Sequence, residues 1–179
     1  MTAMPPATPR VILLTGDGKG KTTAALGMVL RAAGHGLRVA LINFIKADRD
    51  TGETRALARF PEVEVVFCGR GFVRAPSPAQ LARHREAAQR GLNLARERLQ
   101  APEPAMVVLD EICGAVALGL LDASAVAEAV RNAPPGKIVI LTGRQAAPEL
   151  LALADTVSAI ACVRHGMDAG WPAQPGVEC

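Results

Sequence analysis

A stretch rich in glycine and lysine, set between an apolar run and a helical pattern, constrains this chain more than any other feature. Residues 15–23 read Thr-Gly-Asp-Gly-Lys-Gly-Lys-Thr-Thr. The apolar run Val11–Thr15 precedes them, and apolar residues recur at helical spacing over Thr22–Ala33, up to Gly34. Strand, loop and helix in this order are the context of a Walker A phosphate-binding loop.

The chemistry of these side chains agrees with that context. Glycines let backbone N–H groups turn toward phosphate oxygens, and the helix N-terminus adds partial positive charge. Lys21 adds a full charge, and the Thr22 hydroxyl can reach Mg²⁺. A plain glycine-rich turn, the alternative, explains neither the lysines nor the threonines. We therefore expect a nucleotide triphosphate, as Mg-ATP, on the residues Thr15, Gly16, Asp17, Gly18, Lys19, Gly20, Lys21, Thr22 and Thr23. The generic pattern has glycine where Thr15 stands, which predicts a tighter loop.

Two carboxylates, Asp110 and Glu111, follow the apolar strand Met106–Leu109. This placement is typical of a Walker B pair, which holds or orients Mg²⁺ beside the phosphates. We expect Thr22, Asp110 and Glu111 to form the metal site. The alternative is a pair of acids that complement the dipole of the next helix.

Two arginines are further candidates for binding the nucleotide. Arg144 follows the strand Ile138–Leu141 and can fork onto phosphate oxygens, although a surface arginine is the alternative. Arg31 lies in the helix after the loop, where contact with the nucleotide and exposure to solvent are both open.

Strands and helices alternate along the rest of the chain, which predicts a parallel sheet covered on both faces. At 179 residues the chain has the length of one domain. We expect an α/β fold of the single-domain P-loop NTPase-like (RecA-like) type, with a mostly parallel sheet, over residues 11–179. Residues 1–10 are predicted to be a short flexible segment. The other expected elements are strands Val39–Ile45, Val63–Phe67 and Val157–Val163 and helices Pro78–Gln100, Asp122–Asn132 and Pro148–Leu153, with loose segments 47–54, 69–78 and from 165 onward.

Composition narrows the class of function. The formal net charge is only +3 and five residues are aromatic, which disfavours a nucleic-acid-binding face. The helix Pro78–Gln100 carries several arginines, and solvated surface explains it better than a nucleic-acid contact. Four widely spaced cysteines predict buried free thiols, and the three histidines lack metal spacing and are expected to be structural or solvent-facing. Without a long apolar run or a secretion signal, we expect a cytoplasmic protein with no membrane contact.

At this level of detail the chain resembles the ATP:corrinoid adenosyltransferases of the cobalamin pathway. The segment at 15–25, Thr-Gly-Asp-Gly-Lys-Gly-Lys-Thr-Thr-Ala-Ala, is similar to the start of that family. Further motifs agree in order: Phe44-Ile45-Lys46 with Gly52-Glu53, Gly71-Phe72, Val108-Leu109-Asp110-Glu111-Ile112, Leu141-Thr142-Gly143-Arg144, Ala154-Asp155, and a tail of His165, Ala169-Gly170, Ala173-Gln174 and Gly176-Val177-Glu178.

The resemblance implies transfer of the 5′-deoxyadenosyl group from ATP to Co(I) of a corrinoid, with inorganic triphosphate leaving. It implies that Lys21, Arg144 and Mg²⁺ neutralise charge on the triphosphate, and that Phe72 packs beneath the corrin ring. It further implies an electron donor, such as a reduced flavin or flavoprotein, and a homodimer. Two other functions stay open at this point: an ATPase or kinase that splits the γ-phosphate, and a nucleotide-binding regulator without turnover.

Three departures from the family pattern concern the corrinoid rather than ATP. Arg74 stands where the family usually has Trp, and Cys179 replaces a terminal aromatic residue. The N-terminal arm is also shorter than the family usually shows.

Overall fold

The computed structural model describes residues 8–73 and 75–177. Arg74, Cys179 and the first seven residues, on which the three departures fall, lie outside the described residues. Arg10 already begins the first strand. The division of the chain into a segment 1–10 and a domain 11–179 stays a prediction.

In the described part of the chain, six strands form one sheet in the order β3-β2-β4-β5-β1-β6, and all neighbours are parallel. The strands are β1 (Arg10–Thr15), β2 (Val39–Asn43), β3 (Val63–Phe67), β4 (Met106–Asp110), β5 (Ile138–Thr142) and β6 (Thr156–Ala159). The expected α/β fold is confirmed, and over these residues the sheet is parallel throughout. All strand carboxyl ends therefore meet at one edge, where ligands bind in such folds.

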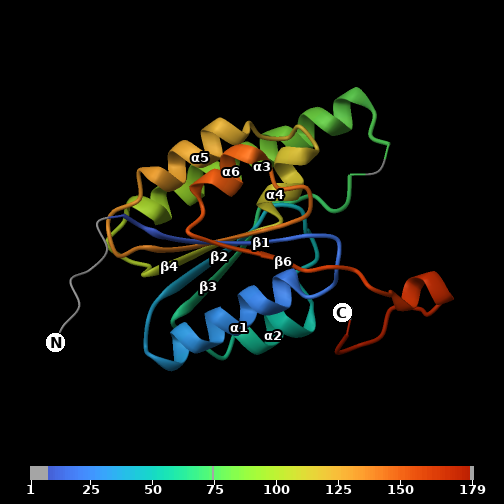
Figure 1. Cartoon of the computed structure of the whole chain (residues 1–179), viewed down its shortest axis with the longest axis horizontal. Helices are drawn as coiled ribbons and strands as arrows, with labels where there is room; N and C mark the ends of the chain where they lie inside the picture. Colours follow the sequence, from blue (N-terminus) through green and yellow to red (C-terminus); the bar gives the residue numbers. More distant parts are fainter. Residues whose placement is uncertain (1–7, 74, 178–179) are drawn as a thin grey trace.

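Helices cover both faces of the sheet, as Figure 1 shows. Helices α1 and α2 lie on one face, and α3, α4, α5 and α6 lie on the other. Their bounds are α1 (Lys21–Gly34), α2 (Gly52–Leu57), α3 (Pro78–Gln100), α4 (Ile112–Ala117), α5 (Ala123–Arg131) and α6 (Pro148–Leu153), with a 3₁₀ turn η1 (Gly166–Ala169). The helices α2 and α4 and the turn η1 were not predicted: α2 begins within the segment 47–54, and η1 lies within the segment from 165 onward, both of which were expected to be loose.

Two strands end earlier than their apolar runs suggested. β2 stops at Asn43, after which the Phe44 N–H still donates to the Asp110 carbonyl oxygen (3.0 Å) before the chain leaves the sheet. β6 stops at Ala159, because the next carbonyl, that of Ile160, accepts from the Gly18 N–H (2.8 Å). The segment after β6 therefore packs against the glycine-rich loop.

Alternate residues of the central strands fill two apolar layers, one on each face. Leu14, Leu41, Val108 and Ile140 pack against α1 on one side of the sheet. Their neighbours Leu13, Ile42, Leu109 and Leu141 pack against α3 and α5 on the other. Burial on both faces explains why these strands are uninterrupted apolar runs in the sequence.

The cysteines are only partly as predicted. Among the described residues, Cys68, Cys113 and Cys162 are free thiols. Cys113 is buried in α4, whereas Cys68 is half-buried and Cys162 is exposed. The prediction of a buried thiol is wrong for Cys162, because it follows β6 on the segment that leaves the core for the loop.

A buried lysine stabilises the end of the sheet where the strands begin, opposite their carboxyl ends. Lys137, just before β5, is 3% exposed. Its ammonium donates hydrogen bonds to the carbonyl oxygens of Ala101 (2.7 Å) and Pro104 (2.6 Å). Burial lowers the pKa of Lys137, and the nearby Glu103 carboxylate opposes this shift. Lys137 thus ties β5 to the loop that leads into β4.

We expect Lys137→Met to lower the free energy of unfolding by about 1–3 kcal/mol, because two carbonyl oxygens lose their hydrogen-bond donor. Urea unfolding followed by circular dichroism measures this, with Arg59→Met, at an exposed position, as the control for loss of a cation. Equal stability of Lys137→Met and the wild type would contradict a structural role for this ammonium.

Candidate nucleotide and metal site

The glycine-rich loop joins β1 to α1 at the carboxyl edge of the sheet. Gly16 (φ 93°) and Gly20 (φ 117°) adopt left-handed conformations that L side chains rarely reach. Gly18 packs so closely on the segment after β6 that an added Cβ would lie 2.5 Å from the Ala161 carbonyl oxygen. Two of these glycines are thus required by backbone conformation and the third by lack of space.

Lys21 points back into this loop. Its side chain is buried, and its ammonium donates to the carbonyl oxygens of Gly16 (2.7 Å) and Gly18 (2.6 Å). Burial, and secondarily the Arg144 charge, lower the pKa of Lys21, while Glu111 and Asp17 oppose the shift. The loop therefore encloses a cation at its centre, where a polyphosphate can replace the two carbonyl partners.

Asp110 lies beneath the loop as the hub of a hydrogen-bond network. It is 1% exposed, and its Oδ1 accepts from the Thr22 hydroxyl (2.9 Å) and the Thr142 hydroxyl (2.7 Å). Thr142 in turn accepts from the Glu111 N–H (2.9 Å). Within the described residues, Asp110 Oδ2 is buried without a hydrogen-bond partner, and the Lys46 ammonium lies 3.6 Å from it. One buried carboxylate oxygen is therefore left for a cation.

Glu111 has an unusual backbone conformation for a residue with a side chain, at φ 61° and ψ 22°. It immediately precedes α4, and among the described residues its side chain makes no capping hydrogen bond to that helix. Burial and the Asp110 charge raise the pKa of Glu111, while Lys21, Lys46 and Arg144 oppose this. Strained backbone of this kind is common at functional sites.

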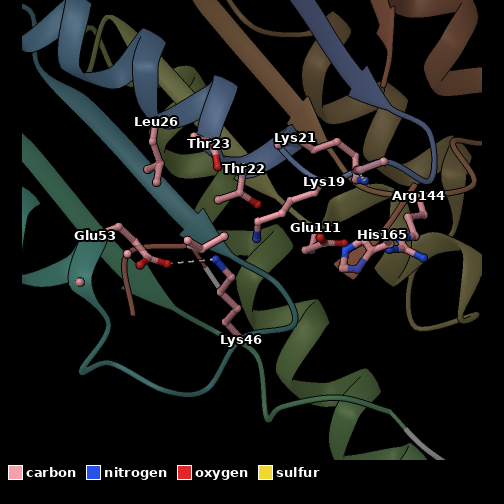
Figure 2. A pocket seen from close by; sticks show the side chains of 15 residues that line it. Lys19, Lys21, Thr22, Thr23, Leu26, Lys46, Glu53, Glu111, Arg144 and His165 are labelled. Carbon is pink, nitrogen blue, oxygen red and sulfur yellow. Dashed lines mark hydrogen bonds and ion pairs between the residues drawn. The ribbon is translucent and has the colours of Figure 1, made fainter. Parts of the chain in front are cut away.

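A cavity of about 470 Å³ opens above these groups. Figure 2 shows Lys46 and Glu53 on one side of it and Glu111, His165 and Arg144 on the other. Its lining comprises Gly18, Lys19, Gly20, Lys21, Thr22, Thr23, Leu26, Lys46, Gly52, Glu53, Glu111, Arg144, His165, Gly176 and Val177. Most of the predicted site residues are therefore brought together.

Other predicted residues lie outside this lining. Thr15, Gly16 and Asp17 form the start of the loop, and Asp110 lies beneath it. Arg31 is exposed in the last turn of α1. It lies ten positions after Lys21 in the helix, a rise of roughly 15 Å. Phe72 is 79% exposed on the segment between β3 and α3.

Sequence reasoning missed four polar side chains at this site, those of Lys46, Glu53, Thr142 and His165. The Lys46 ammonium lies 3.3 Å from Glu53 Oε1. Both residues belong to motifs that carried the family resemblance but to which no role was assigned. The Thr142 hydroxyl joins Asp110 to Glu111. Thr142 ends a buried strand two positions before Arg144, and this place at the carboxyl end of a strand is the sequence signal that could have identified it. His165 lines the cavity, although its Nδ1 also accepts from the Met167 N–H (3.2 Å), as a structural histidine would.

No group of three or more His, Cys, Asp or Glu side chains forms a metal cage within the described residues. Nor do these residues contain a helix long and apolar enough to cross a membrane.

The fold and this loop define a class, that of P-loop proteins with a nucleotide site at the carboxyl edge of a parallel α/β sheet. Residues 7–179 match the family model described as ATP:corrinoid adenosyltransferase BtuR/CobO/CobP. The chain belongs to this family, as its motifs predicted. Membership decides in favour of adenosyl transfer over the two alternatives that the sequence left open.

Curated relatives agree over most of the chain. A corrinoid adenosyltransferase of Pseudomonas aeruginosa is 38% identical over 169 residues, covering 94% of this chain and 82% of the relative. One of Escherichia coli K12 is 38% identical over 169 residues, covering 94% and 84%. One of Sinorhizobium sp. is 34% identical over 171 residues, covering 94% and 79%.

We expect Gly18→Ala to weaken ATP binding by about tenfold or more, since a shift of about 1.4 kcal/mol suffices for that factor. The added methyl group would collide with two backbone carbonyls, those of Ile160 and Ala161, and force the loop open. Titration with a fluorescent ATP analogue measures the dissociation constant.

Gly27→Ala is the matched control, because nothing lies within 4 Å of a Cβ added to this α1 glycine. It should keep wild-type affinity and gain up to about 1 kcal/mol of stability from helix propensity. Wild-type affinity in Gly18→Ala would show that the loop does not need this close contact.

Proposed function

We propose that residues 15–23 hold the triphosphate of ATP as a leaving group while the 5′-deoxyadenosyl group is transferred to Co(I) of a corrinoid. The observation that carries this proposal is the buried ammonium of Lys21 within the loop, next in the chain to Thr22, whose hydroxyl donates to Asp110. Such a loop clamps a polyphosphate rather than presenting an acid or base to a substrate.

The reaction places unusual demands on the protein. Cobalt supplies an electron pair to C5′, the carbon–cobalt bond forms, and the C5′–oxygen bond breaks. The electron pair of the broken C5′–oxygen bond leaves on the triphosphate, so no proton moves in this step and no general base is required. Catalysis then rests on stabilising negative charge on the departing triphosphate.

Cationic side chains supply that stabilisation in our proposal. Lys21 lies inside the loop, and Lys19 and Arg144 lie on the cavity wall. Arg144 is exposed and can fork onto two phosphate oxygens. Removing one preorganised donor of this kind costs about 3–4 kcal/mol in other enzymes.

The residues beneath the loop fit Mg²⁺. The orphaned Asp110 Oδ2 and the Thr22 hydroxyl beside Asp110 are hard oxygen donors, and Glu111 lies at the cavity wall. Mg²⁺ commonly takes one or two carboxylates and completes its shell with water and phosphate oxygens, so a full protein cage is not needed. We propose that Thr22, Asp110 and Glu111 hold the ion, which would neutralise charge on the triphosphate.

The corrinoid side of the site follows the resemblance. We propose that Phe72, exposed on the segment between β3 and α3, packs beneath the corrin ring in place of a lower cobalt ligand. Burying such an aromatic side chain on a ligand would remove a large apolar surface from water. We also propose a homodimer, a reduced flavin or flavoprotein as electron donor, and a cytoplasmic location.

We expect Glu111→Gln to lower kcat for adenosylation of chemically reduced cobalamin by about 100-fold, while the ATP dissociation constant changes little. Removing one negative charge weakens the hold on Mg²⁺ most as the triphosphate departs. The visible spectrum of the corrinoid measures kcat at saturating Mg-ATP. Glu128→Gln, on the exposed face of α5, is the control for loss of a carboxylate. Wild-type turnover in Glu111→Gln would remove Glu111 from the metal site.

A further inference from the structure

Lys46 lies where β2 and β4 end side by side. The register pairs Asn43 with Asp110, and the Phe44 N–H donates to the Asp110 carbonyl oxygen (3.0 Å). The Ile45 carbonyl oxygen accepts from the Gly71 N–H (2.8 Å), which fixes the backbone just before Lys46. The backbone at the base of this side chain is therefore held against the carboxyl end of β4.

The ammonium of Lys46 lies between two carboxylates. It is 3.3 Å from Glu53 Oε1, in the first turn of α2, and 3.6 Å from Asp110 Oδ2. Figure 2 shows Lys46 and Glu53 facing each other at one side of the cavity. Both are about one third exposed, whereas Asp110 is buried. Lys46 can therefore exchange between a buried partner and a partly solvated one by a small movement.

The two Asp110 oxygens have different surroundings. Oδ1 accepts two hydroxyl hydrogen bonds, and Oδ2 accepts none, so the Lys46 ammonium is its counter-ion at ion-pair distance. A buried carboxylate is costly without a nearby cation. A metal ion beside Oδ2 and the Lys46 ammonium would repel each other at such short range.

We propose that Lys46 is a positioning residue: a tethered cation that Asp110 and Glu53 share before the metal arrives and that Glu53 alone holds afterwards. The inference rests on the metal site proposed above. Lys46 is the counter-ion that orients Asp110 in the free enzyme, and Glu53 supplies the partner that lets Lys46 withdraw. The pair sets how readily the site takes its metal.

The test is the affinity of the full-length protein for Mn²⁺ alone, measured by electron paramagnetic resonance of the free ion. Lys46→Met removes the competing cation, so Mn²⁺ should bind about tenfold more tightly. Glu53→Gln removes the alternative partner and leaves Lys46 on Asp110, so Mn²⁺ should bind several-fold more weakly. Lys46→Arg keeps the charge and should stay near the wild type. Arg55→Met, which removes a cation of α2 that pairs with Asp50, is the matched control.

Opposite shifts in Lys46→Met and Glu53→Gln distinguish this role from a plain ion pair between β2 and α2, whose loss from either end would act alike. If the wild type binds Mn²⁺ and Lys46→Met binds it no more tightly, the metal site stands and the role of Lys46 is overturned. If Glu53→Gln binds Mn²⁺ as well as the wild type, the exchange of partners is overturned. If neither the wild type nor any variant binds Mn²⁺, the metal site fails, and this inference with it.

Discussion

The site depends on one buried carboxylate oxygen, Asp110 Oδ1, which accepts hydrogen bonds from two hydroxyl groups. Thr22 brings the first turn of α1 to it, and Thr142 brings the end of β5. Because Asp110 itself ends β4, a helix and two strands are fixed relative to one another at a single atom. Thr142 also accepts the Glu111 N–H, which extends the network to the second carboxylate. A buried, fully engaged oxygen of this kind rigidifies its neighbours, while its unengaged partner oxygen is left for a cation.

Charge around this hub alternates over short distances. Lys21 lies within the loop above, Lys46 lies beside the free Asp110 oxygen, and Arg144 and Glu111 lie on the far wall. Before the nucleotide binds, loop carbonyls are the partners of Lys21, and carboxylates are the partners of Lys46. In our proposal a triphosphate brings enough negative charge to replace those partners, so that the same groups serve both the free protein and the charged leaving group. Adenosyl transfer uses this arrangement well, since the charge that develops lies on the triphosphate and not on a transferred phosphoryl group.

Much of the fold and of the phosphate-binding part of the site could be predicted from sequence. The residues concerned are adjacent in the chain to the strands and helices that position them. Lys21 and Thr22 open a helix directly after a strand and loop, and Asp110 and Glu111 end a buried strand, so parallel topology brings them to one edge. Lys46, Glu53 and His165 could not be placed in this way, because they lie on segments whose paths are set by tertiary contacts. Helix geometry could have placed Arg31 outside the cavity lining, since it lies ten positions after Lys21 along α1. The thiol of Cys162 was misjudged because apolar residues continue beyond the end of β6.

The measurement that tests the central claim most directly is the identity of the phosphate product. Wild-type protein is incubated with Mg-ATP and chemically reduced cobalamin, and phosphorus-31 NMR is compared with chromatography of the corrinoid. If the loop clamps the whole triphosphate as a leaving group, inorganic triphosphate and adenosylated corrinoid should appear in equal amounts. Accumulation of ADP and phosphate, with no carbon–cobalt product, would contradict the account.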